Sequence, residues 1–94
     1  MMEPIKFQDN NWIIRGDATL IQVPSIMRFT NDYEWKNSIS IDLEEVKEVD
    51  TSFLGLIFDL KRQAKRYNKT VKIKNAPTNL LSLAKLYGVE EFIS

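Results

Sequence analysis

The sequence predicts an α/β domain with a mixed sheet of about four strands and helices packed against it. Short runs rich in β-branched and apolar residues, such as residues 39–43 and 71–74, are typical of strands. Longer segments in which apolar residues recur every three or four positions, such as residues 53–67, are typical of helices that cover a sheet. Strands that helices separate run parallel through right-handed crossovers, which gives the chain its expected layered arrangement.

The first third of the chain is predicted to form a β-hairpin and then a helix. Residues 5–8 and 12–15 have strand composition, and the turn-forming residues 9–11 separate them. The helix is expected within residues 20–33, because Pro24 suits a first helical turn, where its missing N–H costs nothing.

The central part of the chain is predicted to run from a strand through a polar connection into the longest helix. Residues 38–43 form the expected strand, and the charged residues 44–48 form the connection. The helix follows Thr51, and at about 100° per residue one of its sides collects apolar residues. This side is the expected core stripe, and it consists of Phe53, Leu56, Ile57, Leu60, Ala64 and Tyr67.

The last third is predicted to form an alternating strand over residues 71–74 and a helix over residues 79–87. Gly88 is expected just after this helix, since glycine readily adopts the left-handed conformation that often ends helices. Residues 89–93 are expected to add an edge segment. The expected buried stripe of the helix consists of Leu80, Leu83, Ala84 and Tyr87.

Composition narrows the classes of function. Ninety-four residues suffice for a single domain over residues 1–94 with a modest core. Thirteen basic and 13 acidic residues give no net charge, which favours neither nucleic acid nor an anionic membrane as a partner. The chain has no cysteine and no histidine, and no glycine-rich phosphate-binding motif, so we expect no enzyme activity, cofactor or metal. No apolar block resembles a signal peptide or a membrane span, so a cytoplasmic location is expected.

The turn Asp50-Thr51-Ser52 opens the long helix and is the sharpest candidate site. All three side chains can accept a hydrogen bond from the free N–H groups of a helix start, so one interpretation is plain capping. The other is a partner-contact or phosphorylation site, because the positive end of the helix dipole favours an anionic group. Thr51 is the functional candidate, while Asp50 is expected to tie the turn together through backbone N–H groups.

The outer face of the same helix is the second candidate site. Leu54 and Phe58 fall away from the core stripe, and two large apolar groups on an otherwise polar face suggest a partner contact. The alternative is that the first helix or a loop covers them. The neighbouring basic residues form a solvated face or steer an acidic partner surface. The complete candidate face consists of Leu54, Gly55, Phe58, Lys61, Arg62 and Lys65.

Four short motifs together resemble the STAS family, the domains of the anti-sigma-factor-antagonist type. They are Ile-Asp-Leu at 41–43, Val-Asp-Thr-Ser at 49–52, Leu-Gly-Leu at 54–56 and Leu-Ala-Lys-Leu-Tyr-Gly at 83–88. The resemblance covers residues 39–93 and implies a STAS-like fold. Asp50-Thr51-Ser52 matches the family's Asp-Ser/Thr-Ser turn, whose first hydroxyl is the phosphorylation or partner-contact position. The chain departs from the family at Phe53, where glycine is usual.

Within this family, the short length and the motif at residues 83–87 are most similar to the MlaB-type subunits. This resemblance implies a non-enzymatic subunit that binds and regulates or stabilises the ATPase of a bacterial phospholipid-transport ABC complex. Any contact with the inner membrane is then indirect, through the complex, and nucleic acid is not a partner. The wider family implies an alternative, a switch of the anti-sigma factor antagonist type that is phosphorylated on Thr51.

Overall fold

A four-stranded sheet forms the centre of the computed structural model, which describes residues 3–93. Strands β1 and β2 pair antiparallel as a hairpin, whereas β2 with β4 and β4 with β6 pair parallel. The predicted mixed sheet of about four strands is therefore confirmed. The strands lie in the order β1 (Ile5–Gln8), β2 (Asn11–Ile14), β4 (Ile39–Asp42) and β6 (Val71–Lys74).

A second, two-stranded sheet was not predicted. The chain forms β3 over Gly16–Ala18 and β5 over Val46–Val49, and the two strands pair parallel. The prediction of a polar connection over residues 44–48 is therefore wrong in its second half. Val46 is buried and Val49 packs against the core, so apolar positions inside a charged stretch anchor β5. Only Glu44 and Glu45 remain as the exposed turn between β4 and β5.

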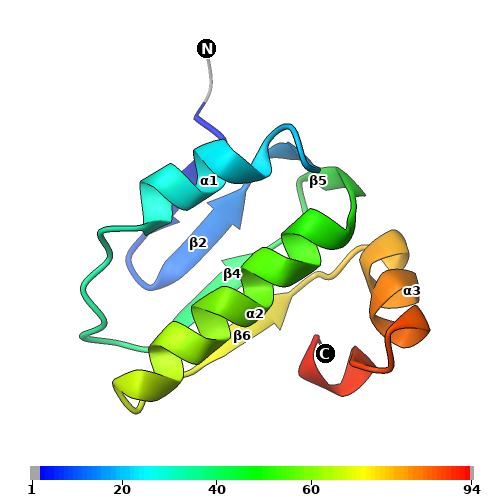
Figure 1. Cartoon of the computed structure of the whole chain (residues 1–94). Coiled ribbons are helices and arrows are strands. Elements are labelled where there is room, and N and C mark those ends of the chain that lie inside the picture. The colour runs from blue at the N-terminus through cyan, green and yellow to red at the C-terminus, as the bar shows by residue number, and fades with distance from the viewer. Residues whose placement is uncertain (1–2, 94) are drawn as a thin grey trace.

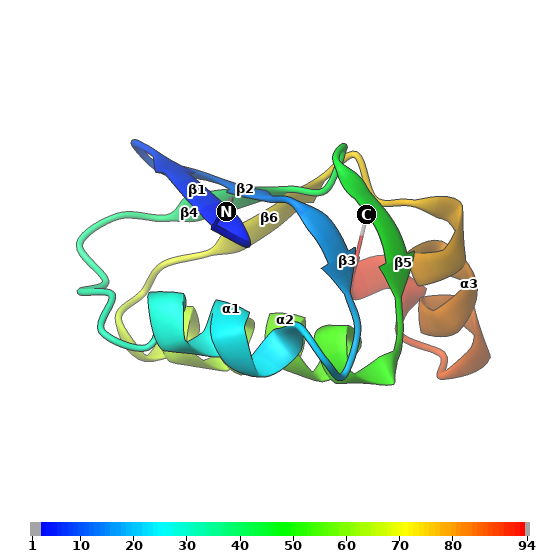
Figure 2. The same ribbon diagram turned by 90° about the horizontal axis from the view of Figure 1, so that it is seen from above.

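Two helices cover one face of the main sheet, as Figure 2 shows. They are α1 (Val23–Thr30) and α2 (Thr51–Arg66), which contact each other along their sides (Figure 1). Strand residues alternate between buried and more exposed positions, as in β4, where Ile39 and Ile41 are buried. The apolar face of the sheet thus meets the helices, and the opposite face carries partly or fully exposed side chains.

The core stripe of α2 is confirmed except at its end. Phe53, Ile57 and Leu60 are buried, and each such side chain contributes about 1.5–3 kcal/mol through removal from water. Leu56 and Ala64 are buried with them. Tyr67 was predicted in this stripe, but it is exposed because the helix ends at Arg66 and Tyr67 is the capping residue.

The chain after β6 forms α3 (Thr78–Leu86), which lies beside the N-terminal part of α2 (Figure 1). Leu80 and Ala84 are buried as predicted, whereas Leu83 is half-buried and Tyr87 is exposed. Gly88 has φ of 69° and ends the helix in the left-handed conformation, as predicted.

The prediction of an edge segment over residues 89–93 is wrong. After Gly88 the chain makes a 3₁₀ helix over Glu90–Phe92 and then buries the side chain of Ile93. The Val89 N–H donates to the Ala84 carbonyl over 2.8 Å, which holds this segment against the end of α3. The C-terminal segment therefore packs beside α2 instead of extending the sheet.

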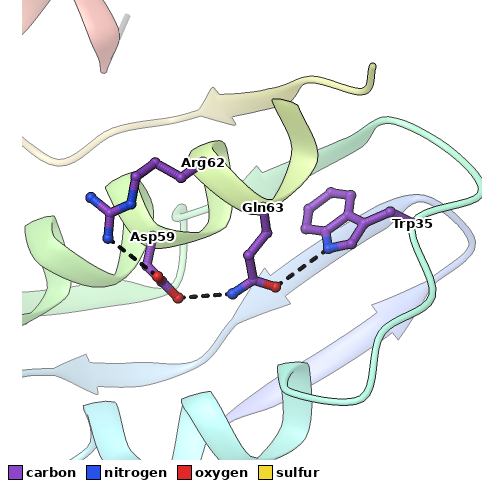
Figure 3. A network of polar contacts seen from close by, with 4 residues as sticks. All are labelled: Trp35, Asp59, Arg62 and Gln63. Atoms are coloured by element: carbon purple, nitrogen blue, oxygen red, sulfur yellow. Dashed lines mark hydrogen bonds and ion pairs between the residues drawn. The ribbon is translucent and has the colours of Figure 1, made fainter. Parts of the chain in front are cut away.

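A polar network joins α2 to the segment that precedes β4 (Figure 3). The indole N–H of Trp35 donates to Gln63 over 3.4 Å, and the Gln63 amide donates to the Asp59 carboxylate over 2.8 Å. Arg62 forms an ion pair with the other Asp59 oxygen at 3.3 Å. Trp35 also packs against Trp12 and Tyr33, so both tryptophans are structural.

Candidate protein-docking site

Asp50 fixes the start of α2. Its backbone is extended, with φ of −137° and ψ of −173°, and one carboxylate oxygen accepts the Ser52 N–H over 2.9 Å as a helix cap. The other oxygen accepts the Leu20 N–H over 2.7 Å, from the loop that precedes α1. Both oxygens of Asp50 are thus used by backbone donors, as expected for a residue that ties the turn together. The same carboxylate joins the α1 loop to the first turn of α2.

Thr51 is the first residue of α2, and its side chain is exposed between two hollows of the surface. Ser52 is half-buried and donates its backbone N–H to Asp50, so it is mainly part of the cap. The larger hollow, of about 620 Å³, is lined by Glu48, Val49, Asp50, Thr51, Asn79, Ser82, Leu83 and Leu86. The smaller hollow, of about 350 Å³, is lined by Thr51, Leu54, Gly55, Phe58, Tyr87 and Val89.

The expectation that Leu54 and Phe58 stand free on the outer face of α2 needs correction. Leu54 is only 6% exposed and belongs to the core, while Phe58 is half-buried. The reason is the C-terminal segment, which returns beside this face. The ring of Phe92 meets that of Phe58 edge to face at 6.0 Å, and Val89 shares a hollow with Leu54. The alternative that another segment covers these two residues is thus confirmed, although the covering segment is the C-terminal one and not the first helix.

The basic residues predicted for this face follow Phe58 along α2. Lys61 is half-buried, its ammonium donates to the Val71 carbonyl over 2.9 Å, and burial lowers the pKa of this ammonium. Arg62 is paired with Asp59, and Lys65 is exposed. These three cations line one hollow of about 280 Å³ together with Phe58 and Phe92. Part of the basic run is thus tied to α2 and β6, and part of it faces solvent.

Sequence reasoning missed the apolar groups that flank Thr51 on other elements. Leu20 and Ile21 are 68% and 82% exposed in the loop that the Asp50 carboxylate holds. On the opposite side, Leu86 and Tyr87 are 75% and 58% exposed at the end of α3. Adjacent apolar residues just before a helix start and just before a terminating glycine were the available sequence signal. Large exposed apolar side chains near one another are typical of surfaces that contact other proteins, so these residues join the candidate site.

The candidate site consists of a helix start with an exposed hydroxyl and of apolar side chains around it. Among residues 3–93, no three potential metal-ligating side chains come together. None of the helices in the same part of the chain has the length and apolar character that would let it cross a bilayer. The arrangement thus provides a hydroxyl at the positive end of a helix, with apolar walls on both sides.

Comparison with known sequences gives one family and one curated relative. The family described as "Mlab, STAS domain" matches residues 14–94. The relative is the intermembrane phospholipid transport system binding protein MlaB of Haemophilus influenzae, which is 29% identical over 59 residues. This match covers 63% of the chain and 56% of the relative, so it spans little more than half of the relative's length.

Comparison with solved structures gives proteins of the same fold. A Thermotoga maritima protein assigned as an anti-sigma factor antagonist superposes with a TM-score of 0.78 at 14% identity, covering 97% of this chain and 82% of that one. The unphosphorylated anti-sigma factor antagonist SpoIIAA gives a TM-score of 0.61 at 15% identity, covering 87% of this chain and 80% of that one. At these identities the likeness shows the STAS fold alone.

Proposed function

The chain belongs to the MlaB STAS-domain family, and on that premise we propose that it is a non-enzymatic interaction subunit of a bacterial phospholipid-transport ABC complex. Its partner is the ATPase subunit, which it binds and regulates or stabilises on the cytoplasmic side of the inner membrane. The contact with the membrane is indirect, through the complex. The similarity to a protein named for intermembrane phospholipid transport supports this choice of partner.

One observation carries the proposal. Thr51 is exposed at the first position of α2, and apolar-lined hollows adjoin it on both sides. A hydroxyl at a helix start is well placed to accept or donate a hydrogen bond at the centre of an interface. The surrounding apolar side chains gain more from a partner than they do in water. The docking surface that we propose therefore consists of Thr51, Gly55, Phe58, Leu86, Tyr87 and Val89.

A second candidate function is a switch that is controlled by phosphorylation of Thr51. The exposed hydroxyl lies at the positive end of the α2 dipole, which favours an added phosphate of roughly −1.5 to −2 charges. Both oxygens of the neighbouring Asp50 accept backbone N–H bonds, which partly offsets its repulsion of a phosphate. Detection of phosphothreonine at this position in protein isolated from its own bacterium favours the switch.

The proposed function is tested by mixing the purified chain with the Mla-type ATPase subunit of the same bacterium. We expect the two proteins to elute together in size-exclusion chromatography, ahead of either protein alone. An unrelated ABC-transporter ATPase from the same cell is the control and should elute separately. Separate elution of the Mla-type ATPase, at concentrations of both proteins well above micromolar, contradicts the proposal.

A further inference from the structure

The larger hollow beside Thr51 is a groove with apolar walls and an acidic rim. We call it the α2–α3 groove, and its lining is given above. Val49 and Leu83 are half-buried in its walls, while Leu86 stands largely in solvent at its edge. Because the wall formed by Leu86 is so exposed, the groove is too shallow to enclose a small molecule on most sides, as ligand pockets do.

The polar side chains that line the groove differ in whether they already form hydrogen bonds within the chain. Asp50 has both carboxylate oxygens bonded, and Asn79 donates to the Lys47 carbonyl over 3.2 Å and accepts the Leu80 N–H over 3.0 Å. The Glu48 carboxylate, by contrast, is exposed and forms no hydrogen bond or ion pair within residues 3–93. No lysine or arginine is among the residues that line the groove. The groove therefore presents an uncompensated negative charge beside an apolar wall.

We propose that the α2–α3 groove receives an apolar side chain of the protein partner, accompanied by a lysine or arginine that pairs with Glu48. This inference rests on the proposed function and specifies the chemistry of the partner at that site. The apolar side chain covers Leu86 and Leu83, which removes exposed apolar surface from water. The basic group is selected because the rim carries negative charge with no cation of its own, and like charge there is disfavoured.

The test uses two substitutions in the groove and two matched controls, with the purified Mla-type ATPase as the probe. Leu86→Ser removes the apolar wall, and Leu81→Ser changes an exposed leucine of the same helix that does not line the groove. Glu48→Lys reverses the rim charge, and Glu45→Lys makes the same change in net charge outside the groove. Because all four side chains are exposed, we expect each variant to melt within a few degrees of the wild type.

We expect Leu86→Ser and Glu48→Lys each to raise the dissociation constant at least tenfold, while the two controls change it less than threefold. The salt dependence of binding should also be weaker for Glu48→Lys than for the wild type. Unchanged affinity in either groove variant overturns the inference, even if the wild-type chain binds. Failure of the wild-type chain to bind the ATPase at all overturns the proposed function itself, so the two failures are distinguishable.

Discussion

Replacing Thr51 with glutamate is expected to weaken binding to the ATPase subunit about tenfold or more and to leave the fold intact. Thr51 is exposed, and a carboxylate is tolerated at a helix N-terminus because the dipole favours negative charge there. In the complex, the same carboxylate is removed from water next to Asp50 and Glu48, and the one basic group that we propose for the partner is already paired with Glu48. Isothermal titration calorimetry gives the affinity, and a thermal melt gives the stability.

The matched control for this substitution is Thr51→Ser, which keeps the hydroxyl at the helix start. Its affinity and melting temperature should stay close to those of the wild type. If Thr51→Glu binds the ATPase as tightly as Thr51→Ser does, Thr51 lies outside the interface. A large drop in melting temperature for Thr51→Glu shows instead that the Thr51 side chain stabilises the helix start, and the loss of affinity then does not place Thr51 in the interface.

Replacing Leu60 with alanine is expected to lower the free energy of unfolding by roughly 2–5 kcal/mol. Leu60 is buried in the core stripe of α2, where its removal leaves a cavity between the helix and the sheet. Urea unfolding followed by circular dichroism measures this loss. A loss below 1 kcal/mol contradicts the packing of α2 that the structure shows.

Phe58→Ala is the companion of Leu60→Ala on the opposite side of the helix. Phe58 is half-buried, with one edge-to-face contact to Phe92, so its loss should destabilise the chain clearly less than Leu60→Ala does. Phe58→Ala should weaken ATPase binding more than Leu60→Ala does, since aromatic anchors at interfaces often contribute about 2 kcal/mol or more. Equal destabilisation by the two variants places Phe58 in the core and removes it from the docking surface.

Local sequence patterns were sufficient to predict the two helices that pack against the main sheet. The three-to-four-residue spacing from Phe53 to Ala64 predicted α2, and the residues at 50–52 predicted its capped start. Pro24, which suits a first helical turn, likewise predicted α1, whose observed start is Val23. In each case the residues that decide the structure lie within one or two turns of each other. The motif at Asp50-Thr51-Ser52 and the family resemblance followed from the same short-range information.

Features that depend on distant segments were predicted wrongly or missed. A helical wheel assigns Leu54 to solvent because it contains no information on residues 89–93, which return beside α2. The residues of β5 were predicted to form a polar connection, because the strand depends on pairing with β3 from the start of the chain. The α2–α3 groove was missed for the same reason, because Glu48 and Leu86 meet only in three dimensions.

The most direct test of the account is to identify the residues of this chain that the ATPase touches. Cross-saturation from unlabelled ATPase to the deuterated, isotope-labelled chain reports amide groups at the interface. We expect the strongest loss of signal at residues 48–58 and 82–92, which surround Thr51, and little loss in β1 and β2. Signal loss concentrated in β1 and β2, with residues 48–58 unaffected, contradicts docking through the Thr51 surface.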